Sequence, residues 1–242
     1  MRSSFRWTVL ACCALLLEPV VLAQGVDVSA KVVLHYDKRT GKAPAQNSDS
    51  SLANVVVWLS PLQVTDPKPA PAPHQPYRLL QKDKQFHPHL LVVPTGSSVE
   101  FPNADPFFHN VFSLFDGKRF DLGLYESGTS RSVKFDREGV SYIFCNIHPE
   151  MGAVVLALST PYYAVSGPDG TVIIHGVPPG SYRLNVWSES AQPVNSSPRV
   201  LQVSAEASSR LGEIAMQPAA SPLGHHKNKF GEEYQPEAKP PY

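Results

Sequence analysis

Short apolar runs alternate with turn residues along almost the whole chain. The apolar runs are residues 26–35, 54–59, 90–93, 98–101, 109–115, 132–135, 140–145 and 153–158. Turn signals such as Pro94-Thr95-Gly96, Asp116-Gly117 and Glu138-Gly139 separate them. Short β-type runs at this spacing predict sandwiches rather than a parallel sheet with crossover helices. No stretch has the periodicity of a long amphipathic helix, so we predict an all-β fold. Residues 121–126 read as a solvated loop.

A second pattern begins after Pro161, with strands expected at 171–174, 181–187, 200–203 and 211–215. The run from Asp169 to Leu184, DGTVIIHGVPPGSYRL, resembles the carboxypeptidase regulatory-like, or prealbumin-like, sandwich. That family opens with two strands that residues 161–216 lack and residues 26–62 supply. We therefore predict that 26–62 and 161–216 form one discontinuous sandwich, with 77–160 inserted as a second domain. The competing arrangement is a contiguous domain 26–160 followed by a small one.

Three further segments are predicted to lie outside the packed domains. Residues 1–23 read as a signal peptide: Arg2 and Arg6 precede the apolar run 7–17, and cleavage is expected after Ala23. The run is too short to cross about 30 Å of hydrocarbon, and no other stretch is long enough. Residues 63–76 form a proline-rich connector, and residues 217–242 a disordered tail. We expect a periplasmic protein. Lipid anchoring through Cys12 or Cys13 is the less favoured alternative.

The charge balance and the cysteine content limit the functions that the chain can have. The chain has 21 basic and 21 acidic residues, so no strong field points to nucleic acid or to an anionic membrane. Signal cleavage removes two of the three cysteines and leaves Cys145, which then has no partner for an internal disulfide. A lone thiol in an oxidising compartment is buried and inert, reactive, or bound to metal.

The strongest chemical motif is Cys145-Asn146-Ile147-His148-Pro149-Glu150-Met151, between two expected strands. A tight loop there can turn a thiolate, an imidazole and a thioether toward one point. With a second imidazole, this donor set is the one expected of a blue-copper electron-transfer site. The natural candidate for the second imidazole is His109. His87 and His89 leave a second metal contact open, although an exposed or hydrogen-bonded role is favoured.

Residues 77–160 resemble the cupredoxins, a family of Greek-key β-sandwiches, and are closest to its amicyanin-like and plastocyanin-like members. The resemblance rests on Cys-x2-His-x2-Met with a proline after the loop histidine, on Asn110-Val111 after His109, and on residues 86–105. It implies one type 1 copper ion held by His109, Cys145, His148 and Met151. Asn110 is expected to hold the Cys145 loop by hydrogen bonds. The combination with the other sandwich resembles exported bacterial proteins called methylamine-utilisation proteins.

The resemblance implies an electron carrier rather than an enzyme, with a redox protein such as a cytochrome or a dehydrogenase as partner. Three rivals stay open. Copper storage or delivery would use the same soft ligands without electron traffic. A small-molecule enzyme would need an open position where Met151 is expected. Adhesion or carbohydrate binding would use the prealbumin-like part and leave the copper site without a role.

Overall fold

The computed structural model describes residues 25–35, 52–63, 76–114, 117–195, 197–204, 209–224 and 226–234. Every helix or strand element in these ranges is a β-strand, which confirms the all-β fold class. No helix in this part of the chain is long and apolar enough to cross a membrane. The predicted signal peptide and residues 64–75 of the predicted connector lie outside the described residues.

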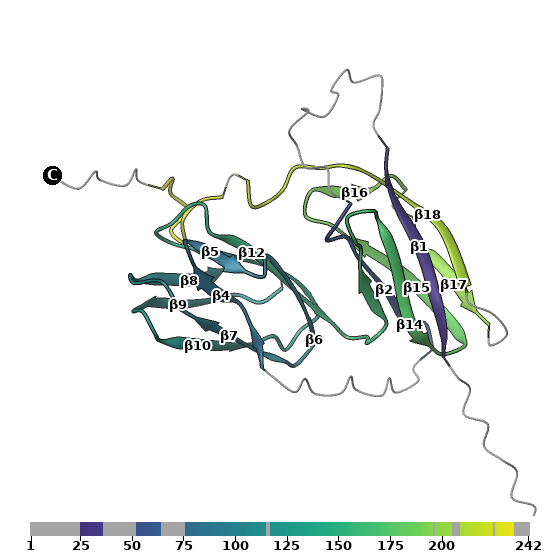
Figure 1. The fold of residues 1–242 in the computed structure, drawn as a ribbon, viewed down its shortest axis with the longest axis horizontal. Helices are drawn as coiled ribbons and strands as arrows, with labels where there is room; N and C mark the ends of the chain where they lie inside the picture. The colour runs from purple at the N-terminus through teal and green to yellow at the C-terminus, as the bar shows by residue number, and fades with distance from the viewer. Residues whose placement is uncertain are drawn as a thin grey trace, which may run out of the picture.

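Strands β3 to β12 form one β-sandwich, called here the central sandwich (Figure 1). They are β3 Tyr77–Arg78, β4 Leu80–Lys82, β5 Gln85–His87, β6 Leu90–Pro94, β7 Ser98–Pro102, β8 His109–Ser113, β9 Phe120–Tyr125, β10 Ser130–Lys134, β11 Gly139–Cys145 and β12 Gly152–Leu158. The larger sheet has the order β6-β12-β11-β8-β9 and the smaller one β10-β7-β3, while β4 and β5 form a hairpin. Strand β9 replaces the solvated loop expected at 121–126, because it pairs with β8 and buries Tyr125.

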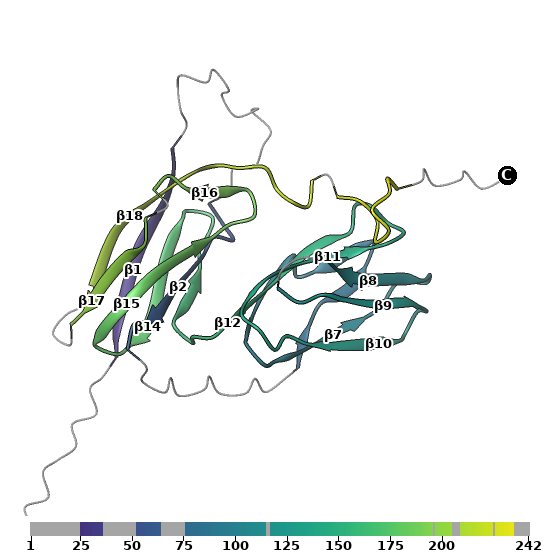
Figure 2. The ribbon, with the colours of Figure 1, turned by 180° about the vertical axis from the view of Figure 1, so that it is seen from behind.

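The remaining strands form a second sandwich, called here the flanking sandwich (Figures 1 and 2). They are β1 Val26–Leu34, β2 Val56–Pro61, β13 Tyr163–Val165, β14 Thr171–Val177, β15 Gly180–Trp187, β16 Ala191–Pro193, β17 Arg199–Val203 and β18 Ser209–Pro218. Its sheets have the orders β14-β1-β18-β16 and β13-β2-β15-β17. Strands from both ends of the sequence therefore lie side by side, as a discontinuous sandwich requires. The exact domain boundaries stay a prediction.

The two sandwiches are joined by an apolar cluster, called here the intersheet cluster. Its buried members are Val56 of β2 and Leu156 and Leu158 of β12. Trp58, Leu90, Val92, Val140, Tyr163 and Trp187 pack against them. Alternate residues of β12 instead enter the core of the central sandwich, including Val155 and Ala157. Because both faces of β2 and β12 are covered, both strands are almost continuously apolar in sequence.

The C-terminal region differs from the expected disordered tail. Strand β18 extends to Pro218, and residues 219–224 and 226–234 continue from the flanking sandwich onto the central one (Figure 2). We call these two ranges the C-terminal strap. The contacts that hold it involve a few spaced side chains, such as His226 stacked on Phe144 with ring centroids 4.1 Å apart. A composition-based prediction of disorder does not detect contacts of this kind. Residues 235–242 lie outside the described part.

Candidate metal centre

The predicted ligand residues lie where strands of the larger central sheet end. His109 is the first residue of β8, a strand with every residue buried, and Cys145 is the last residue of β11. These strands pair side by side, with Cys145 opposite Val111. His148 and Met151 lie in the loop of residues 145–151 that leads into β12. That loop closes on itself, because the Met151 N–H donates to the His148 carbonyl at 3.1 Å.

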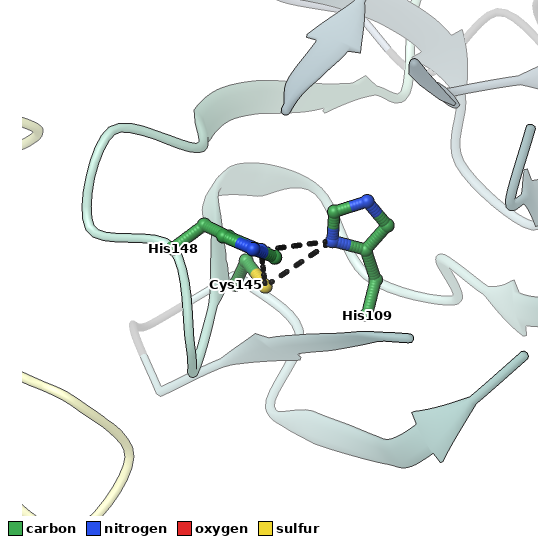
Figure 3. A group of neighbouring side chains, drawn as sticks. All are labelled: His109, Cys145 and His148. Atoms are coloured by element: carbon green, nitrogen blue, oxygen red, sulfur yellow. Dashed lines mark hydrogen bonds between the residues drawn. The ribbon is translucent and has the colours of Figure 1, made fainter. Parts of the chain in front are cut away.

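Three donor atoms converge in the interior (Figure 3). Nδ1 of His109 and Nδ1 of His148 are 3.1 Å apart, and they lie 3.7 and 3.6 Å from Sγ of Cys145. Metal bonds of about 2.0 Å to imidazole and about 2.3 Å to thiolate, at open angles, separate such atoms by roughly 3.3 to 3.7 Å. The three residues therefore fit one shared metal ion with little adjustment. Among the described residues, no other group of three or more histidine, cysteine and acidic side chains has such spacing.

Asp105 fixes the orientation of His109. Its Oδ2 accepts a hydrogen bond from Nε2 of His109 at 2.8 Å, and both side chains are almost fully buried. A proton on Nε2 leaves Nδ1 with a free lone pair facing Cys145 and His148, which is the tautomer that binds a metal. Burial raises the pKa of Asp105, but the bonds from His109 and from the backbone N–H groups of Lys84 and Asp83 outweigh this and hold the pKa below its ordinary value.

The environment of Cys145 keeps its thiol protonated in the absence of a cation. Burial raises the pKa of Cys145, while hydrogen bonds from the backbone N–H groups of Asn110, Ile147 and His148 act in the opposite direction. Those N–H groups therefore favour the thiolate form of Cys145. A metal that displaces the thiol proton therefore finds the negative sulfur already surrounded by donors.

The fourth predicted ligand, Met151, is fully buried in the core of the central sandwich. Its carbonyl accepts a hydrogen bond from the Cys145 N–H at 3.3 Å, so the two residues close opposite ends of the same loop. Met151 therefore lies in the same loop as Cys145 and His148, with its backbone next to that of Cys145. Its role as a ligand stays a prediction.

The expected hydrogen bonding of Asn110 to the Cys145 loop stays a prediction for its side chain. The backbone N–H of Asn110 lowers the pKa of the Cys145 thiol, while its side-chain Nδ2 donates to Oδ1 of Asp121 at 2.7 Å. Asp121 also pairs with Nζ of Lys229 at 2.7 Å. Burial raises the pKa of Asp121, but the bonds from Lys229, Asn110 and the backbone of Gly123 hold it below its ordinary value. Asp121 thus links the side chain of Asn110 to Lys229 of the C-terminal strap.

One aromatic ring packs against both imidazoles of the centre. The ring of Phe107 lies 5.2 Å from that of His109 and 5.5 Å from that of His148, measured between centroids. His148 retains 7% exposure, while His109, Cys145 and Met151 retain none. Phe108 points outward and is 55% exposed. His148, which follows the exposed Ile147 in the chain, is therefore the part of the centre that reaches the surface.

Asp105, Asp121 and the C-terminal strap are the features that sequence reasoning missed. Asp105 stands four residues before His109, but this spacing alone does not identify a carboxylate that bonds an imidazole. Among the described residues, the other histidines do not join the centre. Nε2 of His89 contacts Glu189 at 2.5 Å, His87 is exposed, and His226 stacks on Phe144. His225 lies outside the described residues.

No family model matches the chain, and no curated protein matches its sequence. Part of the chain is similar to three solved structures. Purple cupredoxin from Nitrosopumilus maritimus is 23% identical over 34% of this chain and 99% of that one, with a TM-score of 0.31. Amicyanin from Paracoccus versutus is 17% identical over 41% and 97%, with a TM-score of 0.33. A copper-containing nitrite reductase from Thermus scotoductus is 19% identical over 52% and 28%, with a TM-score of 0.33. These identities and TM-scores are low, so the comparisons carry no conclusion about the chemistry of the site.

Proposed function

We propose that this protein binds one copper ion through His109, Cys145, His148 and Met151 in a type 1 site and carries single electrons between redox proteins. The observation that carries the proposal is the convergence of two imidazole Nδ1 atoms and one sulfur within a buried space. Two imidazoles and a thiolate, with a weak thioether, favour copper that cycles between two oxidation states. Bound copper would supply the one-electron couple.

The chain's own residues suit that role. Asp105 holds His109 in one orientation, and the backbone N–H groups around Cys145 hold the sulfur. Ligands fixed by strands and hydrogen bonds move little when the charge of a bound ion changes by one, which favours rapid electron exchange. The exposed edge of His148 gives a short path to a partner, and its apolar neighbours favour a brief contact with a small interface.

Burial of the ligand residues also bears on the alternatives. An enzyme acting on a small molecule needs an open position reached from solvent, whereas His109, Cys145 and Met151 have no exposed surface. This favours a carrier over an enzyme. Copper storage or delivery uses the same soft ligands, and the experiment below separates it from electron transfer.

The cellular setting is part of the same proposal. The N-terminal sequence of Arg2, Arg6 and the apolar run 7–17 supports export to the periplasm. A cytochrome or a dehydrogenase in that compartment would be the redox partner. The flanking sandwich is proposed to be the prealbumin-like domain that the sequence resembles.

The test is the visible absorption spectrum of a chain beginning at Gln24, loaded with one equivalent of Cu(II), beside its Cys145→Ser variant. We expect an intense blue band from the thiolate–copper bond that bleaches on reduction, returns on oxidation and is absent from the variant. A colourless protein that binds Cu(I) and releases it to an acceptor would instead establish storage or delivery. Retention of zinc with no copper band would exclude both roles.

A further inference from the structure

The C-terminal strap contacts the 145–151 loop on several sides. The hydroxyl of Tyr234 donates to the carbonyl of Cys145 at 2.8 Å. The backbone N–H of Lys229 donates to Oδ1 of Asn146 at 2.9 Å. Two residues that flank the predicted ligands, Phe144 and Gly152, are also covered: His226 stacks on Phe144, and a side chain at Gly152 would meet the methyl groups of Leu223.

A separate contact ties the strap to the other strand of the centre. Nζ of Lys229 pairs with Asp121, and Asp121 accepts a hydrogen bond from Asn110, the residue after His109. The strap therefore touches the surroundings of both strands that supply ligand residues. The strap is itself ordered by internal contacts, since Nδ1 of His226 bonds the Leu223 carbonyl and the rings of His226 and Tyr234 lie 5.3 Å apart.

We propose that Tyr234 is a positioning residue of the metal centre and that the C-terminal strap holds the 145–151 loop closed over the sulfur of Cys145. The hydroxyl of Tyr234 acts on the carbonyl of the residue whose sulfur faces the two imidazoles. It thereby limits how far the Cys145 backbone moves. The strap bonds the carbonyl of Cys145 and the side chain of Asn146, not the sulfur or the imidazole nitrogens, so it restrains the loop without occupying a ligand position.

This arrangement has two consequences. Without metal, Cys145 reacts with a thiol reagent only when the loop opens, so the reaction rate reports the opening equilibrium. With metal, and resting here on the proposed copper site, a looser loop changes the geometry at the sulfur and therefore the energy of the thiolate–copper absorption. The first readout is independent of the identity of the metal.

The experiment uses the full chain from Gln24, in which Cys145 is the sole cysteine. The rate at which metal-free protein reacts with a chromogenic disulfide reagent is compared for the parent, Tyr234→Phe and a chain ending at Pro218. The matched control is Tyr182→Phe, which removes a hydroxyl that donates to the Pro178 carbonyl at 2.9 Å in the flanking sandwich. The copper-loaded forms are then compared by visible absorption and reduction potential.

We expect Tyr234→Phe to raise the rate of thiol modification about fivefold, the factor expected when one ordinary hydrogen bond is lost from the closed state. The shortened chain should react at least about tenfold faster, and Tyr182→Phe should react like the parent. In the copper-loaded forms, Tyr234→Phe should shift the absorption band and the potential, which a general loss of stability would not do.

Equal rates for the parent, Tyr234→Phe and the shortened chain would overturn the inference. If the shortened chain does not fold, Tyr234→Phe alone decides, and an unchanged rate for it overturns the inference. A parent protein without a blue band disproves the proposed copper function, but the thiol rates still decide the role of the strap.

Discussion

Asp105 and His109 form a buried pair in which the carboxylate accepts a hydrogen bond from Nε2 at 2.8 Å. Two backbone N–H groups, of Asp83 and Lys84, also donate to that carboxylate at 2.6 and 3.0 Å. The hairpin of β4 and β5 thereby holds Asp105, and Asp105 holds the imidazole. Outer partners of this kind commonly change metal affinity by about ten- to a hundredfold when they are removed.

Replacing Asp105 by Asn should weaken copper binding by about ten- to a hundredfold. The neutral amide keeps the shape of the side chain but no longer raises the basicity of His109, and it offers a second orientation. A competition titration against a chelator of known affinity measures the effect. Asp136→Asn is the control, because Asp136 is half exposed and pairs with Lys118 at the surface. Equal copper affinities for the two variants would show that Asp105 does not support metal binding by His109.

Replacing Met151 by Leu separates packing from ligation. Leu nearly conserves the volume, so the free energy of unfolding of the metal-free protein should fall by less than about 1.5 kcal/mol. The thioether is lost, so the absorption spectrum should change and the reduction potential should rise. Met151→Ala should cost about 2 to 5 kcal/mol because the residue is fully buried. If Met151→Leu kept the parent's absorption spectrum and reduction potential, Met151 would be a core residue and not a ligand.

Leu156→Ala tests the intersheet cluster. The side chain is buried between β12 and the flanking sandwich, so its truncation should lower the free energy of unfolding by about 2 to 5 kcal/mol in urea. The control Leu124→Ala removes an exposed side chain and should stay within about 0.5 kcal/mol. Similar losses from the two variants would show that the cluster adds no stability.

The contact between His89 and Glu189 should make stability depend on pH. The hydrogen bond that His89 donates to the Glu189 carboxylate raises the pKa of His89. Burial raises the pKa of Glu189, but the bonds from His89 and Ser221 outweigh this and lower it. The stability that protonated His89 contributes to the folded state is therefore fully present below its unfolded pKa of about 6.5. It is lost as pH rises through the higher pKa of the folded state. The contribution from Glu189 is present above about pH 4.3 and is lost on acidification.

His89→Gln should therefore lower the melting temperature more at about pH 5.5 than at pH 9. Because the His89 side chain is half exposed, screening limits the effect to about 1 kcal/mol or less. Thermal unfolding followed by circular dichroism at the two pH values measures it. His87→Gln is the control on the same segment, since His87 is exposed. An equal loss at both pH values would contradict an ionic role for the pair.

The strands that could be predicted from sequence are those with a local signal. The runs at 54–59 and 153–158 are β-branched and apolar, and the structure has β2 and β12 there. Two of the missed strands lack a clear local signal: Asp121 and Gly123 interrupt β9, and β3 has only two residues. Such segments become strands because they pair with neighbouring strands, and a short stretch of sequence does not show that pairing.

At the metal centre, too, sequence identified the residues that have a local motif and missed those whose role depends on the fold. The sequence spacing of Cys145 and His148 and the context of His109 led to three residues that the structure brings together. Asp105 was missed because its role depends on the hairpin that folds over it. The C-terminal strap was missed because Lys229 and Tyr234 meet residues 121 and 145 only in the folded chain.

The pairing of β1 with β18 distinguishes the two sandwiches. The central sandwich finds all its strand partners between Tyr77 and Leu158, so its pairing needs no strand from outside that range. The flanking sandwich needs strands from both sides of that range, because Val28 of β1 meets Ser209 of β18. The residues that contact Cys145 and Asn146 lie beyond β18 in the sequence. The strands that carry His109 and Cys145 therefore have all their partners without the segment that closes over the Cys145 loop.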